Sequence, residues 1–414
     1  MGGDSSVNHN FDAEVDRRDS NSVKWEFIQS GEDLLKWEHT HRFFGEDRVL
    51  PMWVADMDFM CPRPVVDALI ARAQHGIYGY TAPTQAFYRS VVRWMQRRHG
   101  WKIAPEWICI TPGVVPAVNM LVRAFVSTGD RVLIQPPVYY PFYGAVENNG
   151  AELALNPLVY ENGRYRMDLV DLEAKCRDPK VKLAILCSPH NPVGRVWTRE
   201  ELVRFGEICI ANDVLVVSDE IHGDLIYKGH SFTPFANVSD AFARNSVTCT
   251  SPSKTFNLAG LQTSCIVIPN HDLRSRFERI LQSNGLFGIG AFGVVALQAA
   301  YDHGEEWLVQ LLEYLEGNLE YLEQYVAEHI PQLTVVRPEG TYLVWLDCRR
   351  LRLGKWELKQ LMLEEARVYL DDGFIFGPEG EGFERINIAC PRAVLVEALD
   401  RIRQAVGRLS DGIQ

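Results

Sequence analysis

The segment Ser251-Pro252-Ser253-Lys254 has residue types that directly suggest chemistry. It follows the apolar run SVTCT, which has the composition of a buried strand. In an open α/β sheet, ligands bind beyond the carboxyl ends of the strands. A lysine at that place can form an imine with an aldehyde cofactor, while nearby serine hydroxyls hold an anion. Most lysines are solvated surface charges, so this motif needs support from other segments.

Two further strand ends carry polar side chains that such a cofactor could use. Asp219 follows the apolar run VLVVS and could keep a pyridine nitrogen protonated, as an electron-accepting cofactor requires. Asn191 comes shortly after KLAIL, and its amide could donate a hydrogen bond to a phenolic oxygen. Each has a simpler alternative, because aspartate commonly caps a turn or helix and Asn-Pro is itself a turn signal.

The turn from Thr111 to Pro116 leads from the apolar run WICI into a helical pattern. Backbone N–H groups at a helix N-terminus bind phosphate well, although most strand-to-helix turns share this property. Together the four segments provide an imine-forming lysine, a pyridinium partner, an amide donor and a phosphate cradle. That combination is far less expected by chance than any one of its members.

Alternating strands and helices are predicted to position these side chains. Six short apolar runs indicate buried strands, at residues 107–111, 131–137, 182–189, 214–221, 246–251 and 263–269. Amphipathic stretches at 115–126 and 199–212 favour helices between them. This alternation is typical of an α/β fold, a mostly parallel sheet with helices on both faces. We assign residues 75–304 to a large cofactor-binding domain of this kind.

The rest of the chain predicts a smaller α+β domain. A long amphipathic helix over 305–330 precedes a hairpin-like pair of strands, a helix and a last strand. The segment 23–74 is too short, and its polar and apolar residues are too mixed, to form its own core. We therefore assign it, together with residues 305–414, to the small domain. Residues 1–22 have few apolar side chains and are predicted to be a disordered leader.

Composition and charge restrict the classes of function. The 414 residues are 47% hydrophobic, which suffices for a sizeable core. A net charge of -12 would repel nucleic acid and anionic lipid, and no apolar run is long enough to span a membrane. The nine cysteines include no C-x-x-C pair, and the first residues contain no signal-peptide core. These features favour a cytoplasmic protein without a zinc site.

Taken together, the motifs resemble the fold type I pyridoxal-phosphate enzymes of the class I/II aminotransferase group. Asn191 and Asp219 are 28 residues apart, and Asp219 and Lys254 are 35 apart, close to the spacing in that group. The segments PMWVADMDF, YGYT, DEIH and NIACPR are similar to those of the MalY/PatB type of carbon-sulfur β-lyases. The resemblance extends over about residues 24–408.

The resemblance implies a role for each matching residue. Lys254 would bind pyridoxal phosphate and move the substrate α-proton, Asp219 would pair with the pyridinium nitrogen, and Arg392 would bind the substrate α-carboxylate. The other implied site residues are Asn191 at the cofactor O3′ and the substrate, His222 beside the cofactor, Tyr139 stacked on its ring, Ala55 at the substrate, and Gly113, Val114, Val115, Ser251 and Ser253 at the phosphate. Tyr80 would reach the phosphate of a neighbouring subunit, which implies a homodimer with shared active sites.

Two positions depart from the aspartate-aminotransferase pattern. His222 stands where that branch has a tyrosine, and Gln262 where it has a phosphate-binding arginine. Residues 283–301 also lack any arginine or lysine that could receive a second substrate carboxylate. We therefore expect a non-dicarboxylic substrate, with its sulfur substituent held near Leu286, Phe287 and Ile289.

The resemblance thus implies a cystathionine or cysteine-conjugate β-lyase that releases a thiol, pyruvate and ammonia. Two alternatives stay open. An aminotransferase would use the same scaffold but return the proton to a different carbon. A regulatory binding protein could keep the fold and act through partner contacts, although no helix-turn-helix fits in the short leader and the catalytic set is complete.

Overall fold

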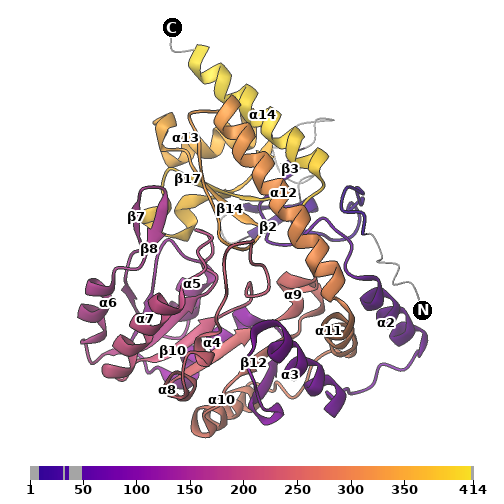
Figure 1. Cartoon of the computed structure of the whole chain (residues 1–414), viewed down its shortest axis with the longest axis vertical. Coiled ribbons are helices and arrows are strands. Elements are labelled where there is room, and N and C mark those ends of the chain that lie inside the picture. Colours follow the sequence, from indigo (N-terminus) through magenta and orange to yellow (C-terminus); the bar gives the residue numbers. More distant parts are fainter. Residues whose placement is uncertain (1–8, 31–32, 37–48, 412–414) are drawn as a thin grey trace.

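A larger α/β part and a smaller α+β part make up the chain (Figure 1). The computed structural model describes residues 9–30, 33–36 and 49–411. Within these ranges, no helix combines the length and apolar character needed to cross a membrane.

A seven-stranded sheet forms the centre of the larger part. Its strands are β4 (Ile108–Thr111), β5 (Arg131–Ile134), β6 (Glu152–Leu155), β9 (Val181–Cys187), β10 (Leu215–Asp219), β11 (Ser246–Thr250) and β12 (Ser264–Val267). They are ordered β4-β12-β11-β10-β9-β5-β6. Only β12 is antiparallel to its neighbours. The carboxyl ends of the other six strands therefore meet at one edge of the sheet.

Helices cover both faces of this sheet, as the alternation predicts. Leu183 and Ile185 of β9 face one layer, while Ala184 and Leu186 face the other. The first layer contains α4 (Val114–Phe125), α5 (Pro141–Glu147) and α10 (His271–Ser283). The second contains α6 (Leu169–Cys176), α7 (Arg199–Ala211) and α8 (Asp240–Arg244). At the β12 end of the sheet, α3 (Gln85–His99) and α11 (Ala291–His303) join a third core cluster.

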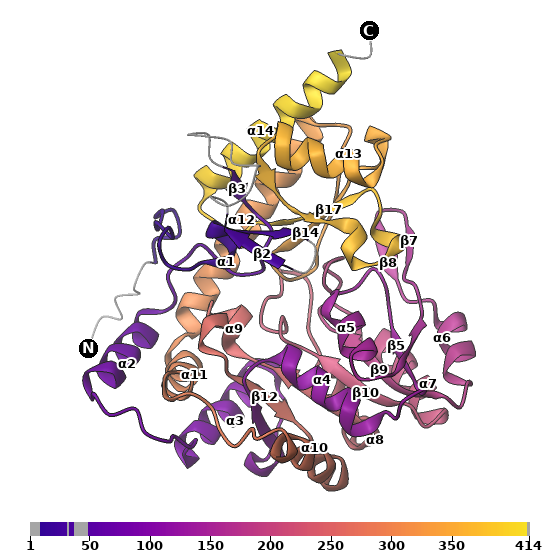
Figure 2. The ribbon, with the colours of Figure 1, turned by 180° about the vertical axis from the view of Figure 1, so that it is seen from behind.

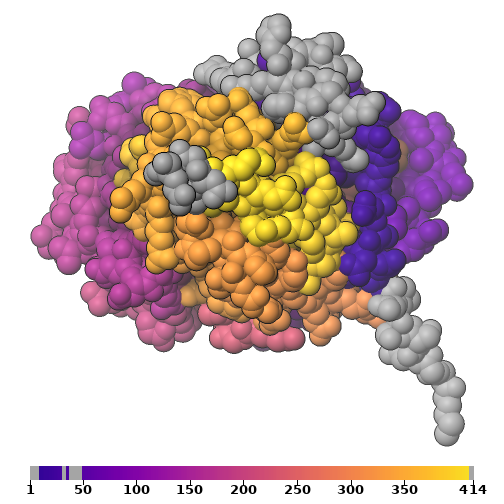
Figure 3. All heavy atoms as spheres, turned by 90° about the horizontal axis from the view of Figure 1, so that it is seen from above, coloured from indigo at the N-terminus to yellow at the C-terminus, as the bar shows by residue number. Residues whose placement is uncertain are grey.

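The smaller part is built around helix α12 (Glu305–His329) and an antiparallel sheet. That sheet has the order β13-β14-β17-β16, from β13 (Thr334–Val336), β14 (Leu343–Asp347), β16 (Asp371–Asp372) and β17 (Phe383–Asn387). The predicted hairpin-like pair is confirmed as β13 and β14. Helix α13 (Lys355–Gln360) follows β14, and α14 (Arg392–Asp411) runs across the outer surface above α12 (Figure 3).

Short elements complete the chain. Near the N-terminus, α1 (Val23–Glu26) is followed by a hairpin of β1 (Phe27–Ser30) and β2 (Asp33–Lys36). The next strand, β3 (Leu50–Pro51), pairs with β15 (Val368–Tyr369) of the small part. A second hairpin joins β7 (Val159–Glu161) to β8 (Arg164–Arg166).

The position of helix α2 (Arg63–Gln74) differs from the predicted domain division. It lies beside α11, in the larger part (Figure 2). Residues 63–74 therefore do not join the small domain, although β3, within the same predicted range of 23–74, does pair with it.

The expectation of a disordered leader does not hold for residues 9–22. Phe11 is 6% exposed and packs its ring against Trp307 and Tyr314 of α12. Arg17 forms ion pairs of 2.7 and 2.8 Å with Asp56 and Asp58. One aromatic side chain is enough to order this segment, because it packs into the hydrophobic core that the rest of the chain forms. Residues 1–8 of the predicted leader lie outside the described residues.

Candidate active site

A cavity of about 180 Å³ lies where the parallel strands end. Its lining comes from the segments around the ends of β4, β5, β9, β10 and β11, from the start of β12, and from residue 55. All the predicted site residues except Tyr80 and Arg392 line it, namely Ala55, Gly113, Val114, Val115, Tyr139, Asn191, Asp219, His222, Ser251, Ser253 and Lys254. Strand topology thus brings together side chains from distant parts of the sequence.

Lys254 lies on the short helix α9 (Pro252–Thr255), directly after β11. Its Nζ donates a hydrogen bond of 2.6 Å to the carbonyl oxygen of Ala55. Burial lowers the pKa of Lys254 to about 8, and the nearby carboxylates of Asp56 and Asp219 only partly oppose that effect. A larger fraction of this amine is therefore neutral near pH 7 than of a solvated lysine, which suits both imine formation and proton transfer.

Asp219 is the last residue of β10 and is 4% exposed. Its Oδ1 accepts a hydrogen bond of 3.2 Å from the backbone N–H of Ile221. Burial raises the pKa of Asp219 to about 7, against the opposing influence of that N–H and of Lys254. A cation bound beside this carboxylate would stabilise its charged form and lower the pKa again. The side chain is therefore suited to hold a protonated ring nitrogen.

Asn191 and His222 are two further buried polar groups of the cavity. Oδ1 of Asn191 accepts a hydrogen bond of 3.0 Å from Nη1 of Arg385, which fixes the orientation of the amide. Burial, together with the positive charges of Lys254 and Arg385, lowers the pKa of His222 well below its usual value, so the ring is neutral at pH 7. Nδ1 of His222 is buried and has no hydrogen-bond partner among the described residues. Such an atom beside a cavity marks a position for a ligand atom.

Helix α4 begins at the turn for which the sequence predicts a phosphate cradle. Gly113 precedes the helix, and no side chain caps its first N–H groups. Those groups line the cavity and can bind an anion. The hydroxyl of Ser251 instead donates 2.8 Å to the carbonyl of Thr263 and accepts from the N–H of Ser253, so Ser251 stabilises the start of α9. The hydroxyl of Ser253, the other predicted serine, makes no such structural hydrogen bond among the described residues.

Arg392 lies outside the cavity, which corrects its predicted role. It begins α14, where its Nε donates a 2.7 Å hydrogen bond to Asn318 of α12. Its guanidinium lies 4.9 Å from the centre of the Tyr321 ring. These contacts hold α14 against α12, away from Lys254 and Asp219.

Arg385 on β17 is a residue that the sequence analysis does not name; it does not line the cavity itself, but it donates a hydrogen bond to Asn191, which does. It is 3% exposed, and its Nη2 donates to the carbonyl of Trp53 at 2.9 Å and pairs with the carboxylate of Asp371. Its charge contributes to the lowered pKa of both Lys254 and His222. Nε of Arg385 is buried without a partner in the described part of the chain, so a donor remains for a ligand. An arginine inside the fully buried strand FERIN is the sequence signal that could have identified it.

Tyr342 is a second residue that sequence reasoning missed. Its hydroxyl donates 2.9 Å to the same Ala55 carbonyl that accepts from Lys254. Asn387 donates to the carbonyls of Val54 and Asp56 on either side. The small part therefore positions the WVADMDF segment against the lysine.

The comparisons with known proteins agree with this geometry. Residues 48–402 match the model of the aminotransferase class I and II family. The chain belongs to that family. It is 50% identical over 376 residues to cystathionine β-lyase PatB of Bacillus subtilis (strain 168), covering 91% of this chain and 97% of the relative. It is 32% identical over 373 residues to protein MalY of Escherichia coli (strain K12), covering 90% and 95%.

Solved structures share the architecture. Cystalysin from Treponema denticola, whose crystal structure contains a pyridoxal 5′-phosphate cofactor, superposes with a TM-score of 0.93 at 35% identity. The match covers 97% of this chain and all of cystalysin. The predicted α/β fold of type I is confirmed.

Tyr80 does not reach the cavity of its own chain. Its side chain is fully exposed, and Ile77, in the same segment, is also exposed. The apolar residues predicted to hold the sulfur substituent also lie outside the lining of the cavity, with Phe287 exposed and Ile289 buried.

Proposed function

We propose that this protein is a pyridoxal-phosphate-dependent carbon-sulfur β-lyase that cleaves cystathionine or cysteine S-conjugates. The observation that carries the proposal is the convergence of Lys254, Asp219, Asn191 and the start of α4 on one cavity. The 50% identity to a cystathionine β-lyase supports the choice of reaction. When bound, the cofactor accepts electrons from the α-carbon of an amino acid.

The residues of the cavity fit this cofactor. Lys254 would form the covalent link to its aldehyde, and Asp219 would keep the ring nitrogen protonated. The amide of Asn191 and Nδ1 of His222, which has no partner among the described residues, would bind polar atoms of the ring. The uncapped N–H groups after Gly113, with Ser253, would hold the phosphate, and Tyr139 would stack on the ring.

Arg385 replaces Arg392 as the group that binds the substrate α-carboxylate. Its guanidinium is held by Asn191 and Asp371 and keeps a buried donor free. A planar guanidinium binds a carboxylate through two parallel hydrogen bonds, which orients the substrate. The substrate α-carbon then lies near Lys254, beside Ala55 and Asn191.

The reaction follows from these positions. The neutral amine of Lys254 takes the proton from the α-carbon, and the thiolate leaves from the β-carbon with the bonding electron pair. The remaining three-carbon fragment hydrolyses to pyruvate and ammonia. Gln262 lines the cavity in place of an arginine, and His222 is neutral, so both keep the surroundings of the cofactor less cationic than in aspartate aminotransferases.

A cytoplasmic homodimer with shared active sites completes the proposal. The fully exposed Tyr80 supports it, together with Ile77, which is 69% exposed. Large side chains exposed together favour a protein interface. In the dimer, Tyr80 reaches the phosphate of the neighbouring subunit.

A substrate panel tests the proposed function. Purified protein with visible cofactor absorbance is given S-substituted cysteines alone, and separately amino acids paired with 2-oxo acids. We expect pyruvate release from the cysteine thioethers and no cofactor absorbance in a Lys254→Ala variant after borohydride treatment and dialysis. A phosphopyridoxyl adduct on a different lysine would contradict the assignment of Lys254.

A further inference from the structure

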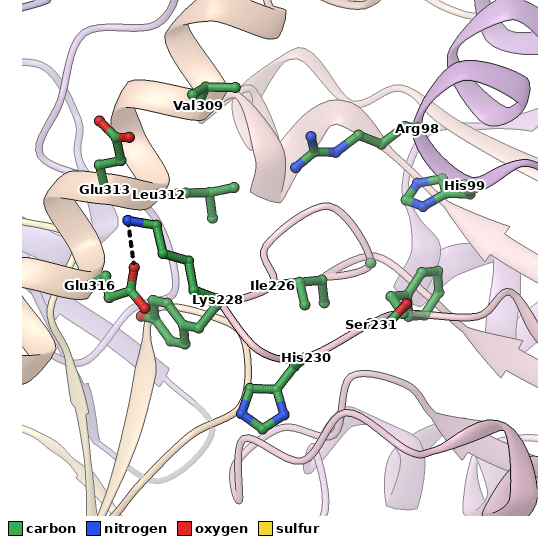
Figure 4. Close-up of a pocket in the computed structure, with 13 residues that line it drawn as sticks. Arg98, His99, Ile226, Lys228, His230, Ser231, Val309, Leu312, Glu313 and Glu316 are labelled. Carbon is green, nitrogen blue, oxygen red and sulfur yellow. Dashed lines mark ion pairs between the residues drawn. The ribbon is translucent and has the colours of Figure 1, made fainter.

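A second cavity, larger than the first, lies on another side of the chain (Figure 4). Its volume is about 380 Å³, which is within the usual range for a small-molecule site. Its lining comes from three places: the end of α3, residues 223–232 after β10, and one face of α12. None of the residues assigned to the proposed reaction lines it.

The charges of this cavity are arranged on opposite walls. Arg98 and His99 extend from α3 on one side, while Glu313 lies on α12 on the other (Figure 4). Ile226, Val309 and Leu312 provide apolar surface. Lys228 lies 3.5 Å from Glu316, so these two charges neutralise each other. Arg98 has a long contact of 3.5 Å with Glu305, and Glu313 has no ion pair in the described ranges of the chain.

One residue of the cavity wall has a buried polar atom without a partner among the described residues. Tyr227 lines the cavity and is 4% exposed. Its hydroxyl is buried without a hydrogen-bond partner in the part of the chain that the structure describes. Leaving a hydroxyl in that state costs free energy, whereas a bound polar molecule or water would satisfy it.

We propose that this cavity binds a small zwitterion with an apolar middle, either a free amino acid or a short peptide. The carboxylate of the ligand binds Arg98, and its ammonium group binds Glu313. Its apolar part lies on Leu312 and Ile226. A ligand with only one charge would leave one wall of the cavity desolvated and unpaired, so recognition requires both charges.

The cavity is connected to the proposed active site through Asp224. Nε2 of His99 lies 2.9 Å from Oδ1 of Asp224, while Thr255 donates to the other carboxylate oxygen at 2.7 Å. Nη2 of Arg98 also donates to the backbone carbonyl of Asp224. Thr255 directly follows Lys254, so a ligand that moves Arg98 or His99 changes the surroundings of the lysine. This coupling rests on the proposed function of Lys254. Binding of a ligand in the cavity does not depend on that function.

Calorimetric titration of borohydride-reduced holoenzyme tests the binding, because reduction prevents amino groups from reacting at the active site. L-Leucine and L-leucylglycine serve as probes, with N-acetyl-L-leucine and L-leucinamide as analogues that each lack one charge. We expect at least one zwitterion to bind ten or more times tighter than both analogues. Leucine binding identifies a free amino acid as the ligand class, and binding of the dipeptide alone identifies a peptide. No binding by either probe overturns the proposal.

Variants locate the site and test the coupling. Glu313→Gln should weaken the binding at least tenfold, whereas Glu320→Gln, an exposed carboxyl on the same helix outside the cavity, should not change it. Equal binding by Glu313→Gln and the parent would overturn the site. Saturating probe should also shift the fluorescence of the reduced cofactor on Lys254. Unchanged fluorescence at saturation would refute the coupling through Asp224 while leaving the proposed reaction untouched.

Discussion

Arg385 of the small part donates a hydrogen bond of 3.0 Å to Oδ1 of Asn191 in the large part, although 194 residues separate them. The bond joins the proposed substrate-carboxylate group to the proposed cofactor O3′ group. Movement of the small part would therefore change both recognition events together.

Replacing Arg385 should damage substrate binding far more than replacing Arg392. For Arg385→Lys we expect KM to rise about 100-fold, because a single ammonium loses a bidentate, charge-assisted interaction worth roughly 3 kcal/mol. For Arg392→Gln we expect KM within about threefold of the parent, with a lower Tm because α14 loses its bond to Asn318. Steady-state kinetics and thermal melts check both. A similar rise in KM for Arg392→Gln would restore the role first predicted for it.

Asp219→Asn should bind the cofactor but turn over slowly. An amide cannot hold the ring nitrogen protonated, and the loss of a preorganised charge partner typically costs roughly 100-fold or more in rate. Glu220→Gln is the matched control, because Glu220 is also buried but does not line the cavity. Absorbance spectra would verify cofactor content before kcat is measured. Near-parental kcat for Asp219→Asn would exclude the proposed pairing.

In protein stripped of cofactor, Asp219 and Asp371 should contribute less to stability as the pH rises from about 4 to 7. Burial raises the pKa of Asp219 to about 7 and that of Asp371 to about 6, so the folded state holds protons that the unfolded chain has released. The stabilising contribution of these two carboxyl groups is therefore greatest below the unfolded pKa and is lost as pH rises through the folded value. Urea unfolding at several pH values should show this slope, and Asp219→Asn should reduce it. A slope that Asp219→Asn leaves unchanged would mean that Asp219 does not titrate in this way.

Mixed dimers test the shared active site. Lys254→Ala and Tyr80→Phe chains, each of low activity, should regain activity when they are unfolded and refolded together, because one site of the hybrid then contains neither substitution. Activity is measured against each variant refolded alone. A fully active monomer by light scattering would refute the sharing of Tyr80.

Much of the larger part could be predicted from local sequence. The six apolar runs correspond to β4, β5, β9, β10, β11 and β12, and the predicted helix over 305–330 corresponds to α12. Strand β6 was missed because it lies at the edge of the sheet, where Glu152 is exposed and no continuous apolar run is needed. The site residues at strand ends were predictable because parallel topology places those ends together.

The rest depends on contacts between distant segments. The NIACPR motif favours Arg392, but whether Arg392 or Arg385 contacts the cavity-lining Asn191 depends on how β17 and α14 pack in the small part. Phe11 likewise becomes ordered only through Trp307 and Tyr314, about 300 residues away. Apart from the arginine within the buried strand FERIN, local sequence does not indicate these contacts, so the sequence alone predicts Lys254 and the residues around the cofactor better than the substrate pocket.

The ratio of products from an L-cysteine thioether tests the proposed reaction most directly. The protein is incubated with L-cystathionine or an S-alkyl cysteine without any 2-oxo acid, and thiol, pyruvate and ammonia are measured over time. The proposed β-lyase reaction predicts equal amounts of all three. Product that forms only when a 2-oxo acid is added, with its amino form accumulating in step, would show an aminotransferase and contradict the lyase.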